Sequence, residues 1–236
     1  MIIGRGLVAK AFSGDWQEDP ATVIVAAGVS NSAEMDRAAF EREEALLEDV
    51  LSASAPRHVV YFGSCAVGNP AERKTPYLRH KAAMEARVLA DPRGQVFRLP
   101  QVVGEGGNPH TLTNFLFARI QAGEPFDVWA KAERNLIDIR DVALLGTHVL
   151  RHAADYPRVM SLADTRSTNM LDIVRCMERV LDRQANCRVL DQGVAFPIDT
   201  RDCQRAALDC GVPLGEGYLS RLLARYYAGK VERPPE

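Results

Sequence analysis

Short apolar runs rich in β-branched residues alternate with helical patterns, and this alternation limits the possible folds more than any other feature. The apolar runs are Met1–Ile3, Thr22–Ala26, His58–Phe62, Val96–Leu99 and Val159–Leu162. Helical spacing of apolar residues is found in Ala38–Ser52, Thr75–Leu89 and Asn114–Ala122. Strands that are apolar throughout and alternate with helices indicate a parallel sheet covered on both faces. We therefore predict an α/β fold with a doubly wound sheet, whose ligand lies beyond the carboxyl ends of the strands.

Charge and composition exclude several classes of protein. The 236 residues include 29 Lys and Arg against 31 Asp and Glu, so no basic field draws the chain to nucleic acid or to an anionic membrane. The longest apolar stretch, Thr22–Val29, is too short to span a bilayer, and the first residues leave no room for a secretory signal. The five cysteines form no CxxC pair, which argues against a disulfide framework or a zinc site. We expect a cytoplasmic protein without metal.

A glycine pattern follows the first apolar run directly. Gly4-Arg5-Gly6-Leu7-Val8-Ala9 has the G-x-G-x-x-[GA] spacing of dinucleotide-binding loops. In such a loop Gly4 permits a tight turn, Gly6 lets the backbone approach a pyrophosphate, and Ala9 lets the helix pack on the strand. The helix N-terminus then offers N–H groups to the phosphates. An incidental glycine turn is the alternative interpretation.

The chain segment that is expected to bind the adenosine of the dinucleotide is shortened. An acidic residue that reads the adenosine ribose is expected about 20 residues further on, but that position falls within Val23–Ala27, the next strand. One or two βα elements are therefore missing between the first two strands, and the ribose-reading acid with them. Arg5 is a candidate partner for a 2′-phosphate, which favours NADP over NAD; a solvated loop arginine is the alternative.

A Tyr–Lys pair lies at the start of the helical pattern over 75–89. Thr75 is suited to cap that helix, and Pro76 to be its first residue. Tyr77 and Lys81 are four residues apart and share a face. A nearby ammonium lowers the pKa of a phenol, so this Tyr is suited to exchange a proton with a sugar oxygen during hydride transfer. His80 is expected off this face, in solvent; a surface helix with an exposed Tyr and Lys is the alternative.

The strand at His58 ends in Gly63 and Ser64, which places the Ser64 hydroxyl where it can bond the same substrate oxygen as Tyr77. The glycine loop, the strand-end Ser64 and the Tyr77–Lys81 pair together resemble the extended short-chain dehydrogenase/reductases. These form the NAD(P)-dependent epimerase/dehydratase group that modifies nucleotide-activated sugars.

The resemblance covers most of the chain. Ile2–Phe12 is similar to the cofactor loop of the family, and Val23–Ser30 to its fourth strand. Phe97–Gly104 resembles the segment R-x-x-N-V-Y-G, with Gln101 in place of the Asn, and the segment 132–143 resembles xRDxIHVxDvA. The second and third strands of the family are missing here, and Gly68 stands where the family has a Tyr.

Site residues follow from the resemblance. The catalytic residues that it implies are Ser64, Tyr77 and Lys81. The cofactor contacts that it implies are Gly4, Arg5, Gly6, Leu7, Val8, Ala26, Ala27, Gly28, Tyr77, Lys81, Leu99 and Pro100. The substrate contacts that it implies are Ser64, Gln101, Asn108, Arg134 and Arg201.

The domain organisation is predicted by the same resemblance. We expect a Rossmann-type dinucleotide-binding domain over 1–103, with 133–163 returning to it. A small lobe that binds the sugar nucleotide is expected over 104–132 and 164–236. The resemblance also implies a homodimer, formed through the helices of Ala38–Ser52 and Thr75–Leu89 in a four-helix contact.

The resemblance also narrows the reaction. Dehydratases of the family carry an Asp-Glu pair where this chain has Cys65 and Ala66, which disfavours dehydration. Gly63-Ser64 and the Arg-Gly loop resemble the keto-sugar reductases. We therefore predict reduction of a 4-keto sugar nucleotide, with or without epimerisation, in the synthesis of capsule or lipopolysaccharide sugars.

Several alternatives stay open. Cys65 and His110 are candidates for the acid and base of an epimerisation step; a packed thiol and a solvated loop histidine are the other interpretations. An NAD-dependent C4 epimerase that retains its cofactor is the second reaction. A non-catalytic module that binds a sugar nucleotide or a cofactor is the alternative of another class.

Overall fold

The computed structural model describes residues 1–68, 75–106 and 111–230. Its centre is a five-stranded sheet in the order β1-β2-β3-β4-β9, and all neighbouring strands are parallel. The strands are β1 (Ile2–Ile3), β2 (Thr22–Val25), β3 (His58–Ser64), β4 (Gly94–Leu99) and β9 (Val159–Ser161). Each one overlaps a predicted apolar run, and the predicted α/β class with a parallel Rossmann-type sheet is confirmed.

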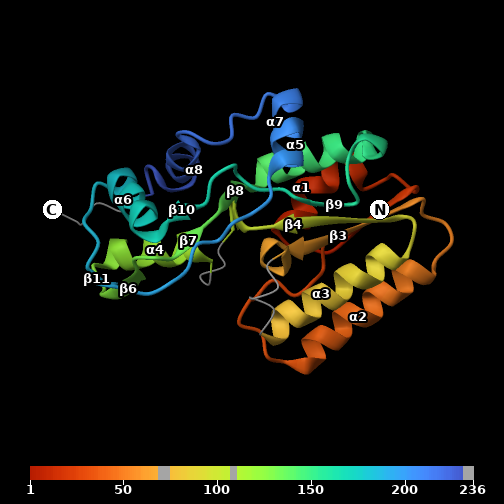
Figure 1. Cartoon of the computed structure of the whole chain (residues 1–236), viewed down its shortest axis with the longest axis horizontal. Coiled ribbons are helices and arrows are strands. Elements are labelled where there is room, and N and C mark those ends of the chain that lie inside the picture. Colours follow the sequence, from red (N-terminus) through yellow and green to blue (C-terminus); the bar gives the residue numbers. More distant parts are fainter. Residues whose placement is uncertain (69–74, 107–110, 231–236) are drawn as a thin grey trace.

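Helices cover both faces of this sheet (Figure 1). On one face lie α1 (Leu7–Trp16) and α5 (Ile139–Arg151), and on the other lie α2 (Arg37–Ser52) and α3 (Pro76–Ala90). Successive side chains of a strand point to opposite faces. Accordingly, Ile24 packs in the same core cluster as Phe12 and Leu145, whereas its neighbours Val23 and Val25 pack in another with Leu47 and Met84. The apolar strands are thus buried on both sides, as the sequence pattern predicts.

The first strand lies at an edge of the sheet. Ile2 and Ile3 pair with Ile24 and Val25 of β2, and within the described residues β1 has no other neighbour. The chain passes directly from α1 to β2, so the predicted absence of βα elements at this point is confirmed. The consequence is that the start of α1 stands at an open side of the sheet.

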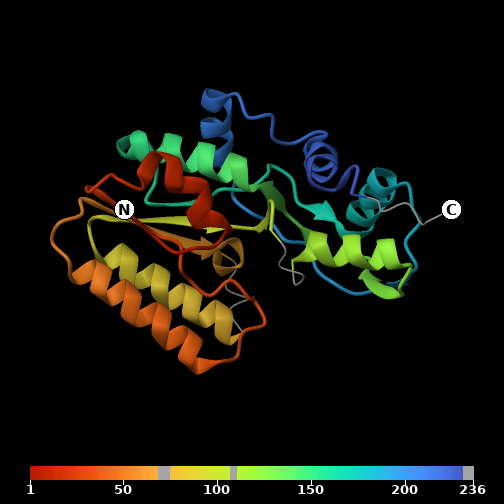
Figure 2. The same cartoon turned by 180° about the vertical axis from the view of Figure 1, so that it is seen from behind.

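A second group of elements lies beside the sheet (Figure 2). Its helices are α4 (Leu112–Ala122), α6 (Met170–Leu181) and α8 (Tyr218–Tyr227). Its strand pairs are β5 (Gln101–Val103) with β8 (Leu136–Asp138), β6 (Phe126–Trp129) with β11 (Cys187–Leu190), and β7 (Glu133–Arg134) with β10 (Thr168–Asn169). Helix α6 packs against α4, α8 and β6. The buried residues of these segments belong to the same hydrophobic cluster as those between the sheet and the helices α1 and α5.

The remaining helices complete the architecture. Two short 3-10 turns, η1 (Cys65–Gly68) and η3 (Ala153–Asp155), follow β3 and α5. Helix α7 (Arg201–Cys210) packs against α5 and β9, so it lies on the body of the five-stranded sheet although its residues fall in the predicted lobe of 164–236. Across the described ranges, no helix is long and apolar enough to cross a membrane.

Candidate active site

The glycine loop has the geometry that its spacing predicts. Gly4 follows β1 with φ +137°, and a Cβ on it would stand 2.4 Å from the Ala26 carbonyl oxygen. Only glycine therefore lets the chain leave β1 so close to the end of β2. Ala9, on the first turns of α1, is buried. The packing of α1 on the sheet thus depends on a small residue there.

Gly6 serves a different purpose. It is the N-cap of α1, makes no side-chain capping bond, and a Cβ on it would meet nothing within 4 Å. The first N–H groups of a helix have no partner within the helix. The N-terminus of α1, which is the positive end of the helix dipole, therefore faces open space. An anion can bind there.

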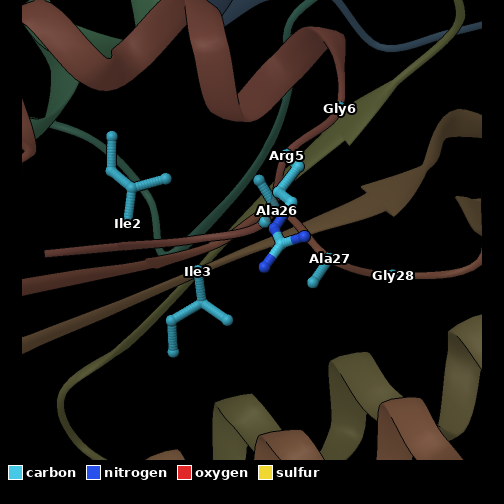
Figure 3. Close-up of a pocket in the computed structure, with 8 residues that line it drawn as sticks. Ile2, Ile3, Arg5, Gly6, Ala26, Ala27 and Gly28 are labelled. Carbon is cyan, nitrogen blue, oxygen red and sulfur yellow. The ribbon is translucent and has the colours of Figure 1, made fainter.

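A pocket of about 700 Å³ opens at this loop (Figure 3). Its lining consists of Ile2, Ile3, Gly4, Arg5, Gly6, Ala26, Ala27 and Gly28. The predicted cofactor residues of β1, the loop and β2 are thereby brought together. Leu7, Val8 and Leu99 are partly buried against the core instead, and Pro100 follows β4 outside this lining.

Arg5 is the cation of this pocket. It is exposed, and within the described part of the chain it has no hydrogen-bond or ion-pair partner. Figure 3 shows its side chain among the lining residues. The helix N-terminus and the glycine backbone fit the pyrophosphate of a dinucleotide, and the unpaired guanidinium fits a further phosphate. The adenosine side, at the β1 edge, has no carboxylate in the lining.

Ser64 and Tyr77 meet at the end of β3. Thr75 caps α3 by accepting a hydrogen bond from Leu78 N at 3.2 Å, and Pro76 is the first residue of the helix. This start directs Tyr77 to the strand end, where its phenol faces the side chain of Ser64. The predicted convergence of hydroxyl and phenol is present, and Tyr77 is buried rather than exposed.

Lys81 does not act on Tyr77 as predicted. Its Nζ lies 6.0 Å from the centre of the Tyr77 ring, but it donates to Glu43 Oε1 at 2.9 Å and to Tyr61 Oη at 3.0 Å. Burial, and then the Glu43 charge, raise the pKa of Tyr77 to about 12. This direction is opposite to the expected effect of Lys81, whose ammonium is bonded to Glu43 and Tyr61.

Glu43 on α2 is a site residue that the sequence reasoning missed. Its carboxylate also accepts hydrogen bonds from Tyr61 Oη at 2.7 Å and from Val29 N at 2.7 Å. Burial opposes the charge of Glu43, but the bonds from His80, Tyr61 and Val29 and the charge of Lys81 hold its pKa at about 2. A signal was present, because Glu43 lies four residues before Leu47 on the apolar face of its helix.

His80 is the second correction. The sequence places it in solvent, whereas its side chain is 4% exposed and its Nε2 lies 3.1 Å from Glu43 Oε2. Its ring also contacts that of Phe40, with centroids 4.7 Å apart. Helix α2 covers α3 at this point and supplies both the carboxylate and the aromatic ring, which explains the burial.

The other candidate residues are dispersed. Cys65 is buried, donates to the Arg98 carbonyl at 3.4 Å, and burial raises its pKa to about 12; these features favour the packing interpretation over a catalytic thiol. Gln101 is exposed at the start of β5. His110 and Asn108 lie outside the described residues.

The two arginines that were predicted to bind the diphosphate lie on different elements, β7 and α7. Arg134 is on β7, partly buried, and donates to the Glu133 carbonyl at 2.7 Å. Arg201 begins α7, where its side chain is 86% exposed and paired with Asp199 at 2.6 Å. Among the described residues, the hydrogen bonds and the ion pair of the Arg201 side chain go to Asp199, and none joins it to Ser64 or Tyr77. Over the same residues, no group of His, Cys, Asp or Glu is arranged to hold a metal ion.

Comparison with protein families gives one match. The model of the NAD dependent epimerase/dehydratase family matches residues 8–163, which includes β2, β3, α3 and β9. The comparison with curated proteins finds no match.

Solved structures with the same fold are numerous, and three illustrate their range. UDP-glucose 4-epimerase from Brucella ovis in complex with NAD is 18% identical, with a TM-score of 0.68 over 96% of this chain and 84% of that one. RMD from Pseudomonas aeruginosa complexed with NADPH is 19% identical, with a TM-score of 0.67 over 97% and 88%. dTDP-glucose 4,6-dehydratase from Bacillus anthracis in complex with NAD is 13% identical, with a TM-score of 0.68 over 89% and 73%. At these identities the likeness shows a shared fold.

Proposed function

This chain belongs to the NAD dependent epimerase/dehydratase family, a family of short-chain dehydrogenase/reductase enzymes, and from that premise we propose that it reduces a 4-keto sugar nucleotide with NADPH. The observation that carries the proposal is the meeting of the Ser64 side chain and the Tyr77 phenol at the end of β3, beside the buried Lys81 of the same helix. A phenol that keeps its proton at neutral pH is a proton donor. In reduction this phenol gives its proton to the keto oxygen, and in the reverse oxidation the same oxygen takes the proton back.

Each part of the site then has a defined role. NAD(P)H, when bound, supplies hydride to the keto carbon. Tyr77 Oη gives its proton to the oxygen of that carbon, and solvent restores the proton to Tyr77. Ser64 orients the oxygen through its hydroxyl. The open N-terminus of α1 beyond Gly6 holds the pyrophosphate of the cofactor.

The preference for NADP rests on Arg5. Its guanidinium is unpaired within the described chain and lines the cofactor pocket, which has no acidic residue in its lining. A guanidinium binds a phosphate through paired hydrogen bonds, whereas a ribose hydroxyl is usually bound by a carboxylate. The solved neighbours include complexes with NAD and with NADPH, so the choice depends on this chain's own residues.

The sugar nucleotide is assigned to the second group of elements. Arg134 on β7 is the residue that we assign to the diphosphate of the substrate, by its match to the family segment. Among the neighbours, the enzyme MoeE5 is in complex with UDP-glucuronic acid and NAD. We place the reaction in the synthesis of surface-polysaccharide sugars in the cytoplasm, as the family suggests.

We also propose that two copies pair through α2 and α3. The two helices pack side by side on one face of the sheet (Figure 1), which offers the surface for a four-helix contact. Light scattering of the purified protein should give twice the chain mass. A monomer at micromolar concentration would contradict this part of the proposal.

Thermal unfolding with NAD⁺, NADH, NADP⁺ and NADPH tests the cofactor site. A ligand at about 100 times its dissociation constant stabilises a protein by roughly 2.7 kcal/mol, so binding shifts the midpoint measurably. We expect the larger shift with NADPH and NADP⁺. No shift with any of the four, in protein that carries no bound cofactor, would contradict an oxidoreductase and favour the non-catalytic module. Release of NAD on denaturation of the untreated protein would favour the C4 epimerase instead.

Turnover is tested with 4-keto sugar nucleotides by the loss of NADPH absorbance. The Tyr77→Phe variant is the matched control, because it removes only the hydroxyl. We expect turnover by this variant to fall at least about a hundredfold, while the thermal shift with NADPH is kept. Equal rates for the two proteins would exclude Tyr77 as the proton donor.

A further inference from the structure

A second pocket adjoins the cofactor pocket, between the loop after β2 and the first turns of α2. It has a volume of about 500 Å³, and Ala27 and Gly28 line both pockets. We propose that this second pocket binds the adenosine of the dinucleotide and that Arg42 of α2 stacks on the adenine ring. The inference rests on the proposed cofactor and names the residues that hold its adenosine end.

The course of the cofactor across the sheet directs its adenosine to this pocket. The pyrophosphate is assigned to the N-terminus of α1, and the nicotinamide has to reach Tyr77 at the end of β3. The dinucleotide therefore runs along the carboxyl ends of the strands, from β3 toward β1. Within the described residues no strand pairs with the far side of β1. The loop after β2 and α2 are therefore the surfaces against which the adenosine can lie.

Helix α2 has an open face at this place. Phe40 and Glu44 contact α3. Ala39, Arg42 and Leu46 are three or four residues apart and so share a different face, which lines the pocket. In the described chain α1 is followed directly by β2, so no intervening βα element supplies a helix to cover this face. The shortening of the chain thus leaves the pocket open to a ligand.

The lining suits a flat aromatic base. Ala27, Gly28 and Ala39 are small, so a ring can approach the backbone of the loop and of the helix. Gly28 cannot be replaced by a larger residue without movement, because a Cβ on it would stand 2.5 Å from Glu43 Oε1. Leu46 is partly buried and offers an apolar contact. Pockets of about 300–1,000 Å³ are the usual size for a small ligand.

Arg42 is the cation of the second pocket. It is exposed, and in the part of the chain that the structure describes it has no hydrogen-bond or ion-pair partner. The carboxylates of the lining bond elsewhere: Glu34 accepts from the two backbone N–H groups that follow it, and Glu43 binds Lys81. A guanidinium stacks well on the face of an aromatic ring. Arg5, in the adjoining pocket, remains the partner of the 2′-phosphate.

Calorimetric titration with adenosine 2′,5′-bisphosphate tests the site, because this probe is the adenosine part of NADP without its nicotinamide. We expect Arg42→Gln to weaken binding of the probe, of NADPH and of NADH alike, by about fivefold. The reason is that all three carry adenine, whereas Arg5→Gln should affect only the ligands with a 2′-phosphate. No binding of the probe to the wild type, or equal binding to Arg42→Gln, would overturn the inference.

The Ala39→Leu variant fills the pocket without a charge change, and leucine is a good helix former. We expect it to weaken binding of the probe by about tenfold or more. Ala45→Leu, at an exposed position of α2 outside the lining, is its matched control. Arg37→Gln, which removes an exposed arginine of the same helix, is the matched control for Arg42→Gln. Equal losses in the pocket variants and in their controls would also overturn the inference.

The outcomes separate this inference from the proposed reaction. Binding of the probe that depends on Arg42 and Ala39 supports the adenosine site even where no keto sugar is reduced, and the reductase alone is then excluded. Binding and oxidation of NADPH that are indifferent to both substitutions would overturn the adenosine site and leave the reductase standing.

Discussion

The two halves of the candidate site are built in opposite ways. The cofactor half is open and made largely of backbone: Gly4, Gly6 and the first turn of α1 around an unpaired Arg5. The proton-transfer half is closed and made of buried side chains, with Glu43 and Lys81 almost without solvent contact. The shape of the cofactor half therefore depends on backbone conformation. The shape of the proton-transfer half depends on charged side chains that pair between helices.

The largest effect is expected at the closed half. Tyr77→Phe should lower kcat by about 10²- to 10⁴-fold, the usual contribution of a general acid. The increase in the thermal midpoint that NADPH causes should equal that of the wild type, because the pocket at Gly4–Gly6 is untouched. Steady-state kinetics and the melting curve together check the two claims. A parallel loss of cofactor binding would show that the two halves are not independent.

A pair of glycine variants sharpens the description of the open half. Gly4→Ala should destabilise the fold by about 3 kcal/mol, since φ is +137° and a Cβ would stand 2.4 Å from the Ala26 oxygen. Gly6→Ala meets nothing within 4 Å, so we expect a stability change below about 1 kcal/mol. The methyl group of Gly6→Ala should instead weaken cofactor binding. Denaturant unfolding and cofactor titration of the two variants measure this contrast, and equal stability losses would refute it.

Acid sensitivity distinguishes the buried carboxylate from an exposed one. The pKa of Glu43 is depressed to about 2, so its contribution is complete above the unfolded value of about 4.3 and is lost as pH falls toward 2. Protonation of Glu43 should lower the free energy of unfolding by on the order of 3 kcal/mol. Asp199 also has a pKa of about 2 but is exposed beside Arg201, where solvent screens the pair. Glu43→Gln should therefore flatten the stability profile between pH 5 and about 2, and Asp199→Asn should not.

The smallest expected effect concerns the choice of cofactor. Arg5→Gln should weaken NADPH binding about tenfold, or about 1.4 kcal/mol, and leave NADH binding unchanged. Lys10→Gln removes an exposed charge from α1, the helix that follows the Arg5 loop, and is the matched control. Calorimetric titration with both cofactors measures the difference. An equal loss for NADH would mean that Arg5 contacts the pyrophosphate instead of the 2′-phosphate.

The sequence predicts the open half well because its determinants are local. The backbone conformation there follows from neighbouring residues: an apolar run forms the strand, Gly4 permits the turn, and the helical spacing after it predicts α1. The sequence also predicts that Ser64 and Tyr77 lie close together. The end of a strand places Ser64, and the capped start of a helix places Tyr77. The environment of Lys81 was not predicted. Its partner Glu43 lies 38 residues away along the chain, and only the packing of α2 against α3 brings them together.

His80 and α7 show the same limit. His80 lies off the Tyr77–Lys81 face, as the helical spacing requires, but that side faces α2 instead of solvent. The helix at Arg201–Cys210 packs on α5 and β9, and nothing in its own pattern distinguishes one apolar partner from another. A helix pattern indicates which residues are buried, but it does not name the surface that buries them.

The position of β1 has a consequence for motion. The cofactor loop follows a strand of two residues that is hydrogen-bonded to β2 alone within the described chain. Edge segments with few backbone bonds open locally far more often than the whole domain unfolds. We therefore expect the loop to exchange its amide protons through small local openings that a bound ligand suppresses. Ordering the loop lowers the affinity for the ligand. Slower amide exchange at Gly4–Gly6 would therefore detect ligand binding even where the free energy of unfolding of the whole domain does not change.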